Sequence, residues 1–450
     1  MKKIILFFAL FFVAVVGAEN VKGIVATKEY PKLGVTELTL ENGMKVILRP
    51  THAEADEICI QILAPRGYSS LKKKDRVSGR LAASIAWESG VGPYDADQLS
   101  SKMYRNGVDL FPNINAFSRT IDGSTDADGL DTFMEIVHLI FTDSQMKNSA
   151  MKQVVANRKR TIINRPLDIE LAFEDQFISL NTQNLNPLRP LLLEDLGSLD
   201  LQEAGNIFRS SFSDPSEFTV VLVGYFDIDE VKEIIAKRLA TIPKGEGFKL
   251  PATTKPPEFP TGITVKKIFI DDTSDSLTRL TFPIIKVMDQ NTFEGLNVLT
   301  QVIETRLRNV LREEMESSQG VDVAYQMPLF PSTDPTWLTI QFRSEPKKEE
   351  KIRNIILKQL EVLRKEGPTD EEIEMVRNNQ TRIDEFWLRY NCFWQANLSN
   401  YYIWGWDPNG ILHDYQESPY LSKSMIQQAL IDDMPLDNYT VLISEPKGKS

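Results

Sequence analysis

The sequence predicts an α+β fold of two similar domains joined by a linker. The segment PKGEGFKLPATTKPPEFPTG, Pro243–Gly262, combines five prolines with several glycines and divides the chain almost in half. Such a composition disfavours regular structure and is typical of linkers. The order of strand-like and helix-like segments is similar on both sides of it, and DEICIQILAP and FTVVLVG in the first half correspond to DSLTRLTFP and YTVLISE in the second. A repeat this long predicts duplicated domains rather than a solenoid.

Alternating apolar residues predict strands in the first half, and apolar residues at helical spacing predict helices. Strands are predicted near Thr36–Arg49, Glu57–Ala64 and Glu217–Phe226, and two more lie near Val108–Asp122. Helices are predicted near Ser78–Ser89, Gly129–Thr142 and Ser144–Asn164. Strands that come in hairpin-like pairs between helices predict a sheet with helices on one face.

The second half follows the same order. Its predicted strands lie near Ile263–Ile270, Asp275–Ile285, Val321–Phe330, Thr336–Arg343 and Asn438–Pro446. Three helices are predicted: a long one that begins at Thr292, one over Lys347–Lys365, and one from Thr369 to about Trp404. The second of these helices has Ile352, Ile356 and Leu360 at helical spacing, which predicts one apolar stripe. The predicted organisation is a leader over residues 1–18, α+β domains over 19–242 and 263–450, and the linker over 243–262.

The first residues are typical of a secretory signal peptide. Lys2 and Lys3 precede the apolar run Ile4–Val16, and Val16-Gly17-Ala18 offers small residues for cleavage. The run is shorter than a membrane span. We expect cleavage after Ala18 and a secreted, periplasmic protein without a transmembrane segment, with an uncleaved anchor as the alternative.

Charge and cysteine content narrow the function classes. A formal net charge of −12 disfavours nucleic acid as a partner, because its phosphates would be repelled. Cys59 and Cys392 are the only cysteines, too few to hold so long a chain together, so a large hydrophobic core is expected. We expect two separate buried thiols, with one disulfide as the alternative.

Six segments point to a known family. They are LTLENGMKVILRPTHAEADEI, FTDSQMKNSAMKQVVANRKRTIINRP, FTVVLVGYFDIDEVKEIIAKRLATIP, LREEM, GPTDEEIEMV and RYNCFWQANLSNYYIWGWDPNGILHDY. Their order resembles the insulinase/pitrilysin family of zinc peptidases, and most closely the second half of its long secreted bacterial members. The resemblance covers nearly the whole chain after the leader. It implies two homologous domains forming half of a clamshell, in which two halves enclose a peptide-binding chamber.

The zinc motif of that family, H-x-x-E-H, does not occur in this sequence. In the motif two histidines one helical turn apart bind zinc, and the glutamate activates water. The corresponding early helix, SGRLAASIAWESG, has no histidine, and His52, His138 and His413 lie far apart along the chain. We therefore expect that this chain binds no zinc and is inactive as a peptidase by itself.

The resemblance then implies a partner. The predicted function is a secreted, non-catalytic subunit that contributes chamber wall and substrate binding to peptide hydrolysis by a homologous zinc-bearing subunit. A leader followed directly by what resembles a second half favours this hypothesis. The main alternative is an inactive scaffold or peptide-binding protein that keeps the peptidase fold, and a further one is an independent hydrolase with unusual ligands.

The stretch LREEMESSQGVDVAY, Leu311–Tyr325, holds the candidate site residues. In the family, the second half supplies an arginine from a run like L-R-E and a tyrosine seven residues later, which can donate hydrogen bonds to the substrate backbone or to a developing oxyanion. Arg312 matches the arginine, but Gln319 stands at the spacing of the tyrosine. If MESSQG is an insertion, Tyr325 takes that position, and if the strand register is kept, the position falls near Asp322.

Both candidates also have structural interpretations. Four charged residues spaced by four would form a ladder of solvated ion pairs, each worth a few tenths of a kcal/mol: Glu304, Arg308, Arg312 and Glu316. Strand alternation puts Tyr325 on the face of apolar Val321 and Val323, which favours packing.

The segment Phe386–Trp406, FWLRYNCFWQANLSNYYIWGW, is dense in aromatic residues. Core packing of a long helix is the favoured interpretation. The alternative is a chamber wall that binds peptide side chains.

Overall fold

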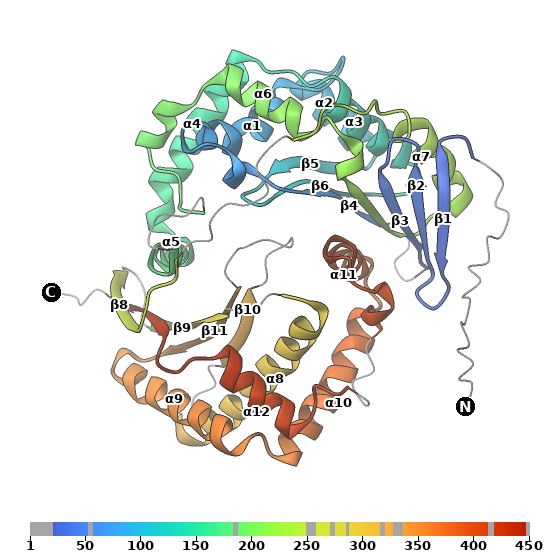
Figure 1. The fold of residues 1–450 in the computed structure, drawn as a ribbon. Helices are drawn as coiled ribbons and strands as arrows, with labels where there is room; N and C mark the ends of the chain where they lie inside the picture. Colours follow the sequence, from blue (N-terminus) through green and yellow to red (C-terminus); the bar gives the residue numbers. More distant parts are fainter. Residues whose placement is uncertain are drawn as a thin grey trace, which may run out of the picture.

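The computed structural model describes residues 21–52, 57–182, 188–248, 258–270, 275–284, 288–315, 320–326, 336–412 and 418–446. Within these residues the chain forms two β-sheets, and helices cover the outer face of each sheet (Figure 1). The predicted leader lies outside the described residues. No helix in the described ranges is long and apolar enough to cross a membrane.

The first sheet, as far as the structure describes it, has seven strands in the order β1-β2-β3-β7-β4-β6-β5. The strands are β1 (Ile24–Tyr30), β2 (Val35–Leu40), β3 (Lys45–Pro50), β4 (Ile58–Pro65), β5 (Asp109–Ile114), β6 (Ser118–Thr125) and β7 (Thr219–Gly224). The helices are α1 (Arg76–Ser89), α2 (Ala96–Arg105), α3 (Leu130–Thr142), α4 (Asn148–Asn164), α5 (Ile169–Thr182), α6 (Leu201–Ser211) and α7 (Ile228–Arg238). β7 lies parallel to β3 and antiparallel to β4, and all its residues after the first are buried.

The second sheet has five described strands in the order β10-β11-β9-β12-β8. The strands are β8 (Ile263–Ile270), β9 (Ser276–Ile284), β10 (Val321–Gln326), β11 (Thr336–Ser344) and β12 (Tyr439–Pro446). The helices are α8 (Gln290–Met315), α9 (Glu349–Glu366), α10 (Asp370–Trp387), α11 (Asn391–Trp404) and α12 (Lys423–Asp433), with the short 3-10 helix η7 (Pro408–Ile411) after α11. In α9, Ile352, Ile356 and Leu360 are buried, as the stripe predicts.

The two sheets share one topology. In the second, β12 lies parallel to β8 and antiparallel to β9, and β11 lies between β9 and β10. In the first, β3, β7, β4, β6 and β5 follow the same order and directions as β8, β12, β9, β11 and β10. β1 and β2 extend the first sheet beyond β3. The repeated topology confirms the predicted α+β fold with two homologous domains.

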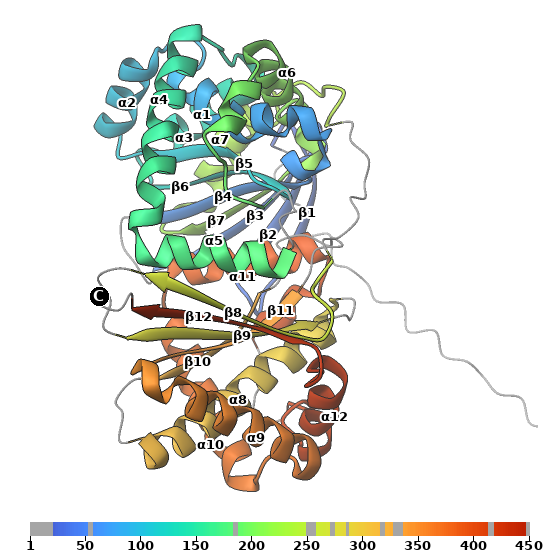
Figure 2. The same ribbon diagram turned by 90° about the vertical axis from the view of Figure 1, so that its left-hand side faces the viewer.

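The corresponding helices α5 and α11 lie between the two sheets (Figure 2). Each packs against the sheet of the other domain. Phe177 of α5 contacts Trp337 of β11 edge-on, with ring centroids 5.2 Å apart. Trp394 and Leu398 of α11 pack against Val221 of β7 in the first sheet. The inner face of each sheet is therefore covered partly by a helix from the opposite half of the chain.

The prediction of one helix from Thr369 to about Trp404 is wrong. The helix ends at Trp387, and α11 begins at Asn391 after a turn in which the Leu388 carbonyl accepts a hydrogen bond from Trp394 Nε1 at 2.8 Å. The break directs α11 onto the first sheet. Burying each large apolar side chain there stabilises the fold by about 1.5–3 kcal/mol, which exceeds the roughly 0.5–1.5 kcal/mol of a helical hydrogen bond lost at the turn.

The predicted linker contains no helix or strand in its described parts, residues 243–248 and 258–262. Residues 249–257 lie outside the described residues. β8 begins directly after this segment, at Ile263.

Candidate functional site

α1 is the early helix on which the family resemblance would place a zinc motif. Its middle consists of small and apolar residues, and Ala82, Ala83 and Ala86 are buried. Two of its serines accept hydrogen bonds from the backbone of other segments. Ser78 Oγ accepts a hydrogen bond from the backbone N–H of Asp200 at 3.0 Å, and Ser89 Oγ accepts one from the N–H of residue 147 at 2.8 Å. α1 therefore supplies packing surface and contains no imidazole.

The two described histidines have separate surroundings. His52 is exposed after β3, and its ring contacts Tyr225 edge-on with centroids 5.6 Å apart. His138 of α3 is half-buried, and its Nδ1 lies 2.8 Å from the carbonyl oxygen of Arg238, to which it donates. His413 lies outside the described residues. Neither described histidine lies close to two other side chains that could bind the same metal ion.

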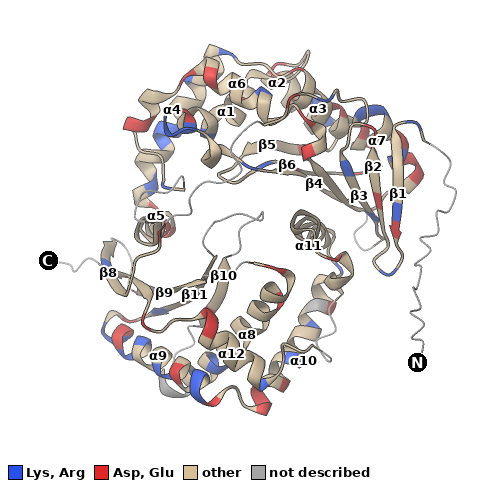
Figure 3. Ribbon diagram, in the orientation of Figure 1, with Lys and Arg blue, Asp and Glu red and all other residues tan. Residues whose placement is uncertain are grey.

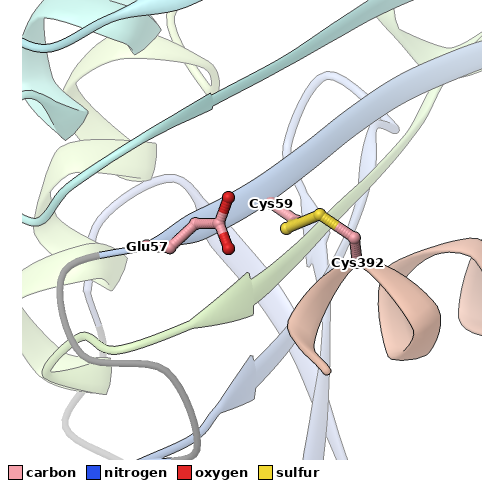
Figure 4. Close-up of side chains that lie close together, drawn as sticks. All are labelled: Glu57, Cys59 and Cys392. Atoms are coloured by element: carbon pink, nitrogen blue, oxygen red, sulfur yellow. A yellow bond between two sulfur atoms is a disulfide. The ribbon is translucent and has the colours of Figure 1, made fainter. Parts of the chain in front are cut away.

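One group of potential metal ligands exists in the part of the chain that the structure describes: Glu57, Cys59 and Cys392 (Figure 4). The two sulfur atoms are joined in a disulfide, so neither can act as a thiolate ligand. Catalytic zinc takes three protein ligands, usually with histidine among them. The described residues therefore do not fit a catalytic zinc site.

The expectation of two separate thiols is wrong. Cys59 on β4 and Cys392 at the start of α11 form a disulfide across 333 positions of sequence, with Cα atoms 5.3 Å apart. The physical reason is the crossing of α11 onto the first sheet, because this packing brings its first turn against β4. Cys59 is buried and Cys392 is exposed.

Polar contacts flank the disulfide. The Thr51 hydroxyl donates to Asn391 Oδ1 at 2.6 Å, and Asn391 Nδ2 donates to the backbone carbonyl of Glu57 at 3.1 Å. The Arg49 guanidinium lies over the Trp394 ring, 3.6 Å from its centroid, and burial lowers the pKa of Arg49 to about 10. α11 itself carries no charged residue (Figure 3). It is thus joined to the first domain by apolar packing, neutral hydrogen bonds, one stacked cation and a covalent bond.

The structure places Arg312 in a groove of about 320 Å³ between α8 and α10. Its side chain is exposed. From the opposite wall, Met375 and Ile383 of α10 also present exposed apolar side chains to this groove. Among the described residues, no carboxylate lies within ion-pair distance of Arg312. The groove thus combines an available guanidinium with apolar surface.

The predicted ladder of charges on α8 forms in part. Arg308 binds Glu304 at 2.5 Å, and both line the same groove as Arg312. Burial raises the pKa of the Glu304 carboxyl above its ordinary value; Arg308 opposes this effect, and the charge of Asp322 adds to it. Glu316 lies outside the described residues. The face of α8 that the sequence predicts to be a solvated ladder is one wall of the groove.

Tyr325 lies on β10 against α8. Its hydroxyl donates to Asn297 Oδ1 at 2.8 Å, and its ring meets Phe293 edge-on with centroids 6.1 Å apart. Alternation along β10 is as predicted: Val321 is buried, Asp322 is exposed and Tyr325 is half-buried. Tyr325 is therefore packed on α8 rather than directed into the groove of Arg312.

A second hollow, which we call the aromatic pocket, has a volume of about 300 Å³ and lies where α8, α10, α11 and η7 meet. Four aromatic side chains line it: Phe293, Trp387, Phe393 and Tyr401. Glu294 and Asn297 of α8 add polar atoms. Ile383 borders both this pocket and the groove of Arg312, so the two hollows adjoin.

The aromatic segment of α10 and α11 divides into two parts. Trp394 and Tyr401 are buried, each with 4% of its surface exposed, which agrees with the expected core packing. Phe386, Trp387 and Tyr390 are exposed and contact one another, with ring centroids 5.2–5.6 Å apart. Core packing is therefore the wrong interpretation for this first part, because the turn between α10 and α11 places it at the surface.

Glu294 and Asn297 line the aromatic pocket but are not among the site residues predicted from the sequence. A pattern could have indicated them, since polar side chains recur about once per helical turn along α8: Glu294, Asn297, Gln301, Glu304, Arg308 and Arg312. That spacing reveals a polar stripe, but it does not show that α10 and α11 turn the stripe into a wall of two hollows.

Comparison with known proteins gives sequence relatives. Residues 207–380 match the family model described as the peptidase M16 inactive domain. The chain is 26% identical over 382 residues to a "Zinc protease PQQL-like" of Arabidopsis thaliana. This match covers 81% of this chain and 37% of the relative. The chain is 20% identical over 343 residues to the "Probable zinc protease PqqL" of Haemophilus influenzae. That match covers 76% of this chain and 36% of the relative. The chain thus spans little more than a third of the length of these relatives.

Solved structures extend the similarity to the whole fold. The periplasmic protease PqqL from Escherichia coli matches with a TM-score of 0.77 and 17% identity, over 99% of this chain and 49% of that chain. A peptidase M16 inactive domain from Pseudomonas fluorescens matches with a TM-score of 0.76 and 14% identity, over 92% of this chain and 98% of that chain. Pitrilysin matches with a TM-score of 0.72 and 14% identity, over 92% of this chain and 45% of that chain. The chain therefore has the fold of one clamshell half of the pitrilysin-like M16 peptidases, and the predicted resemblance to that family is confirmed.

Proposed function

We propose that this chain is the non-catalytic half of a pitrilysin-like metallopeptidase and encloses peptides together with a homologous half that holds zinc. The observation that carries the proposal is the match to an inactive M16 domain in a chain whose α1 helix has no histidine. The first half of PqqL has a fold similar to this chain, with a TM-score of 0.72 and 12% identity over 92% of both chains. That similarity supports pairing between two halves of like shape.

In this proposal the chain binds and orients the peptide, and the partner supplies the zinc and the activated water. Arg312 is the residue of this chain that assists. Its guanidinium presents several N–H donors, so it can hold a peptide carbonyl or stabilise a developing oxyanion. Its exposure in a groove and the absence of an ion-pair partner among the described residues support this role.

Tyr325 receives a more limited role. A phenol has one proton to donate, and the hydroxyl of Tyr325 donates it to Asn297. Tyr325 can donate a hydrogen bond to a substrate only if it gives up this bond to Asn297. This observation favours the second candidate function, a scaffold or peptide-binding protein that keeps the fold without supporting catalysis.

We place the protein in the periplasm. The leader-like residues 1–18 support secretion, and the structural match to a protein described as the periplasmic protease PqqL supports this compartment. The acidic chain would meet peptide substrates and its zinc-bearing partner there.

A complementation assay tests the proposal. The chain and a zinc-bearing homologue from the same organism are purified separately and together, and hydrolysis of an internally quenched peptide is measured. We expect the mixture to hydrolyse the peptide faster than the homologue alone does. We expect Arg312→Ala to lower the kcat/KM of the mixture by about a hundredfold or more, as for loss of an oxyanion donor.

Arg105→Ala serves as the matched control, because Arg105 is exposed on α2 and distant in the fold from the α8–α10 groove. A homologue that is equally active without this chain contradicts the complementing role. If the Arg312→Ala chain stimulates the homologue as strongly as the unmodified chain does, the pairing is supported but Arg312 has no part in the chemistry.

A further inference from the structure

The aromatic pocket combines a carboxylate with several aromatic side chains. Phe293, Trp387, Phe393 and Tyr401 form its walls, and Glu294 is the one charged residue among the described residues that line it. Aromatic faces attract cations through their quadrupole, and tryptophan does so most strongly. A carboxylate beside such faces adds charge-assisted hydrogen bonds to an ammonium or guanidinium group. This composition is that of a site for a cationic side chain.

The carboxylate is positioned by the fold. Glu294 lies in the second turn of α8 and is half-buried, and one of its oxygens accepts a hydrogen bond from Gln290 Nε2 at 3.1 Å. A Cβ atom on Gly410 would come within 2.5 Å of the same Gln290 nitrogen. The glycine in η7 therefore allows Gln290 to sit between η7 and Glu294.

The surrounding charge has the same sign. Burial raises the pKa of Tyr420 first, and the charges of Glu294 and Asp289 raise it further, which indicates negative potential around the start of α8. The whole chain carries a formal net charge of −12. Both features attract basic peptides toward the pocket and repel acidic ones.

We propose that the aromatic pocket binds an arginine or lysine side chain of a peptide. The inference rests on the proposed function for the ligand being a peptide, and it adds the class of side chain recognised. The adjoining groove fits the same ligand, because Ile383 borders both hollows and the exposed Arg312 can hold a backbone carbonyl farther along. One peptide can thus place a basic side chain between the rings while its backbone follows α8 toward Arg312.

Direct binding to the purified full-length chain tests the proposal without any partner. The probes are four fluorescein-labelled peptides rich in glycine, serine and alanine, identical except for one central residue: arginine, lysine, citrulline or leucine. Citrulline keeps the shape of arginine and removes its charge. Fluorescence anisotropy is expected to give the arginine and lysine peptides about tenfold lower Kd than citrulline, the effect of losing a charge-assisted bond.

Variants locate the binding. Glu294→Gln keeps the size of the side chain and is expected to abolish the preference for arginine over citrulline. Trp387→Ala is expected to weaken the arginine and lysine peptides several-fold. The matched controls are Glu350→Gln on α9 and Tyr104→Ala on α2, both exposed and outside the pocket, which are expected to bind as the unmodified chain does.

The outcomes separate the two proposals. Equal binding of the arginine and citrulline peptides by the unmodified chain, or tighter binding of the leucine peptide, overturns the cation site. Neither result bears on the complementation assay, which tests the proposed function separately. An arginine preference that survives in Glu294→Gln also overturns it, because the charge would then be recognised elsewhere. Failure of all four peptides to bind contradicts the inference as well, and activity of the mixed halves then shows whether the proposed function stands.

Discussion

Cys59 and Cys392 connect β4 of the first domain to α11 of the second. The bridge closes a very long segment of chain, and in the loop-entropy description a longer closed loop removes more freedom from the unfolded state. The bond also holds the first turn of α11 where Asn391 binds Thr51 and the Glu57 carbonyl. A single covalent bond therefore stabilises the contact between the two domains.

Replacing both cysteines, Cys59→Ser with Cys392→Ser, is expected to lower the free energy of unfolding by up to about 5 kcal/mol. Urea denaturation of the oxidised chain and of the variant measures the difference. Reductant is expected to lower the midpoint of the unmodified chain and to leave that of the variant unchanged. Two titratable thiols in the folded, unreduced chain would contradict the bridge.

At the scale of elements, α11 belongs to the core of the neighbouring domain, whereas the end of α10 belongs to the surface. Trp394 is buried against the first sheet and donates to the Leu388 carbonyl. Trp387, seven positions earlier in the same aromatic segment, has 45% of its surface exposed. The same residue type thus occupies two environments on either side of one turn.

Trp394→Ala is expected to lower the free energy of unfolding by about 3–5 kcal/mol, because a large buried side chain is lost and a cavity remains. Trp387→Ala is the matched comparison and is expected to cost less than about 1 kcal/mol, as for most surface changes. Thermal and urea unfolding of both variants check this pair. Equal destabilisation by the two substitutions would show that α11 does not pack on the first sheet.

Much of the element pattern could be predicted from the sequence, because one face of each element is apolar at the spacing of its structure. The stripe of Ile352, Ile356 and Leu360 in α9 and the alternation of Val321 and Val323 in β10 are examples. β1 was missed, since its middle residues are all exposed and give no periodic pattern. The turn before α11 was missed because contacts with a distant sheet decide it.

The candidate site was predictable only in part. A local motif led to Arg312, and its exposure at the surface of α8 agrees with an available side chain. The hydrogen bond from Tyr325 to Asn297 and the position of Glu294 among four rings depend on how α8, α10 and α11 meet. The disulfide depends on the same long-range packing, and the spacing of two cysteines carries no information about it.

At the scale of the whole molecule, the two domains exchange equivalent helices. Asn181 of α5 accepts a hydrogen bond from Thr440 of β12 at 2.6 Å, and Asn391 of α11 accepts one from Thr51 after β3 at the same distance. These reciprocal contacts join two sheets of one topology into a single unit. The groove of Arg312 and the aromatic pocket lie on the second domain, along α8.

The zinc content of the isolated chain is the measurement that tests most directly whether it must rely on a partner for hydrolysis. The chain is incubated with excess zinc, dialysed, and analysed by elemental mass spectrometry alongside a peptidase assay. We expect well below one zinc per chain and no hydrolysis, since the described histidines lie apart and both cysteines are bridged. One tightly held zinc per chain together with peptidase activity that a chelator abolishes would contradict this conclusion.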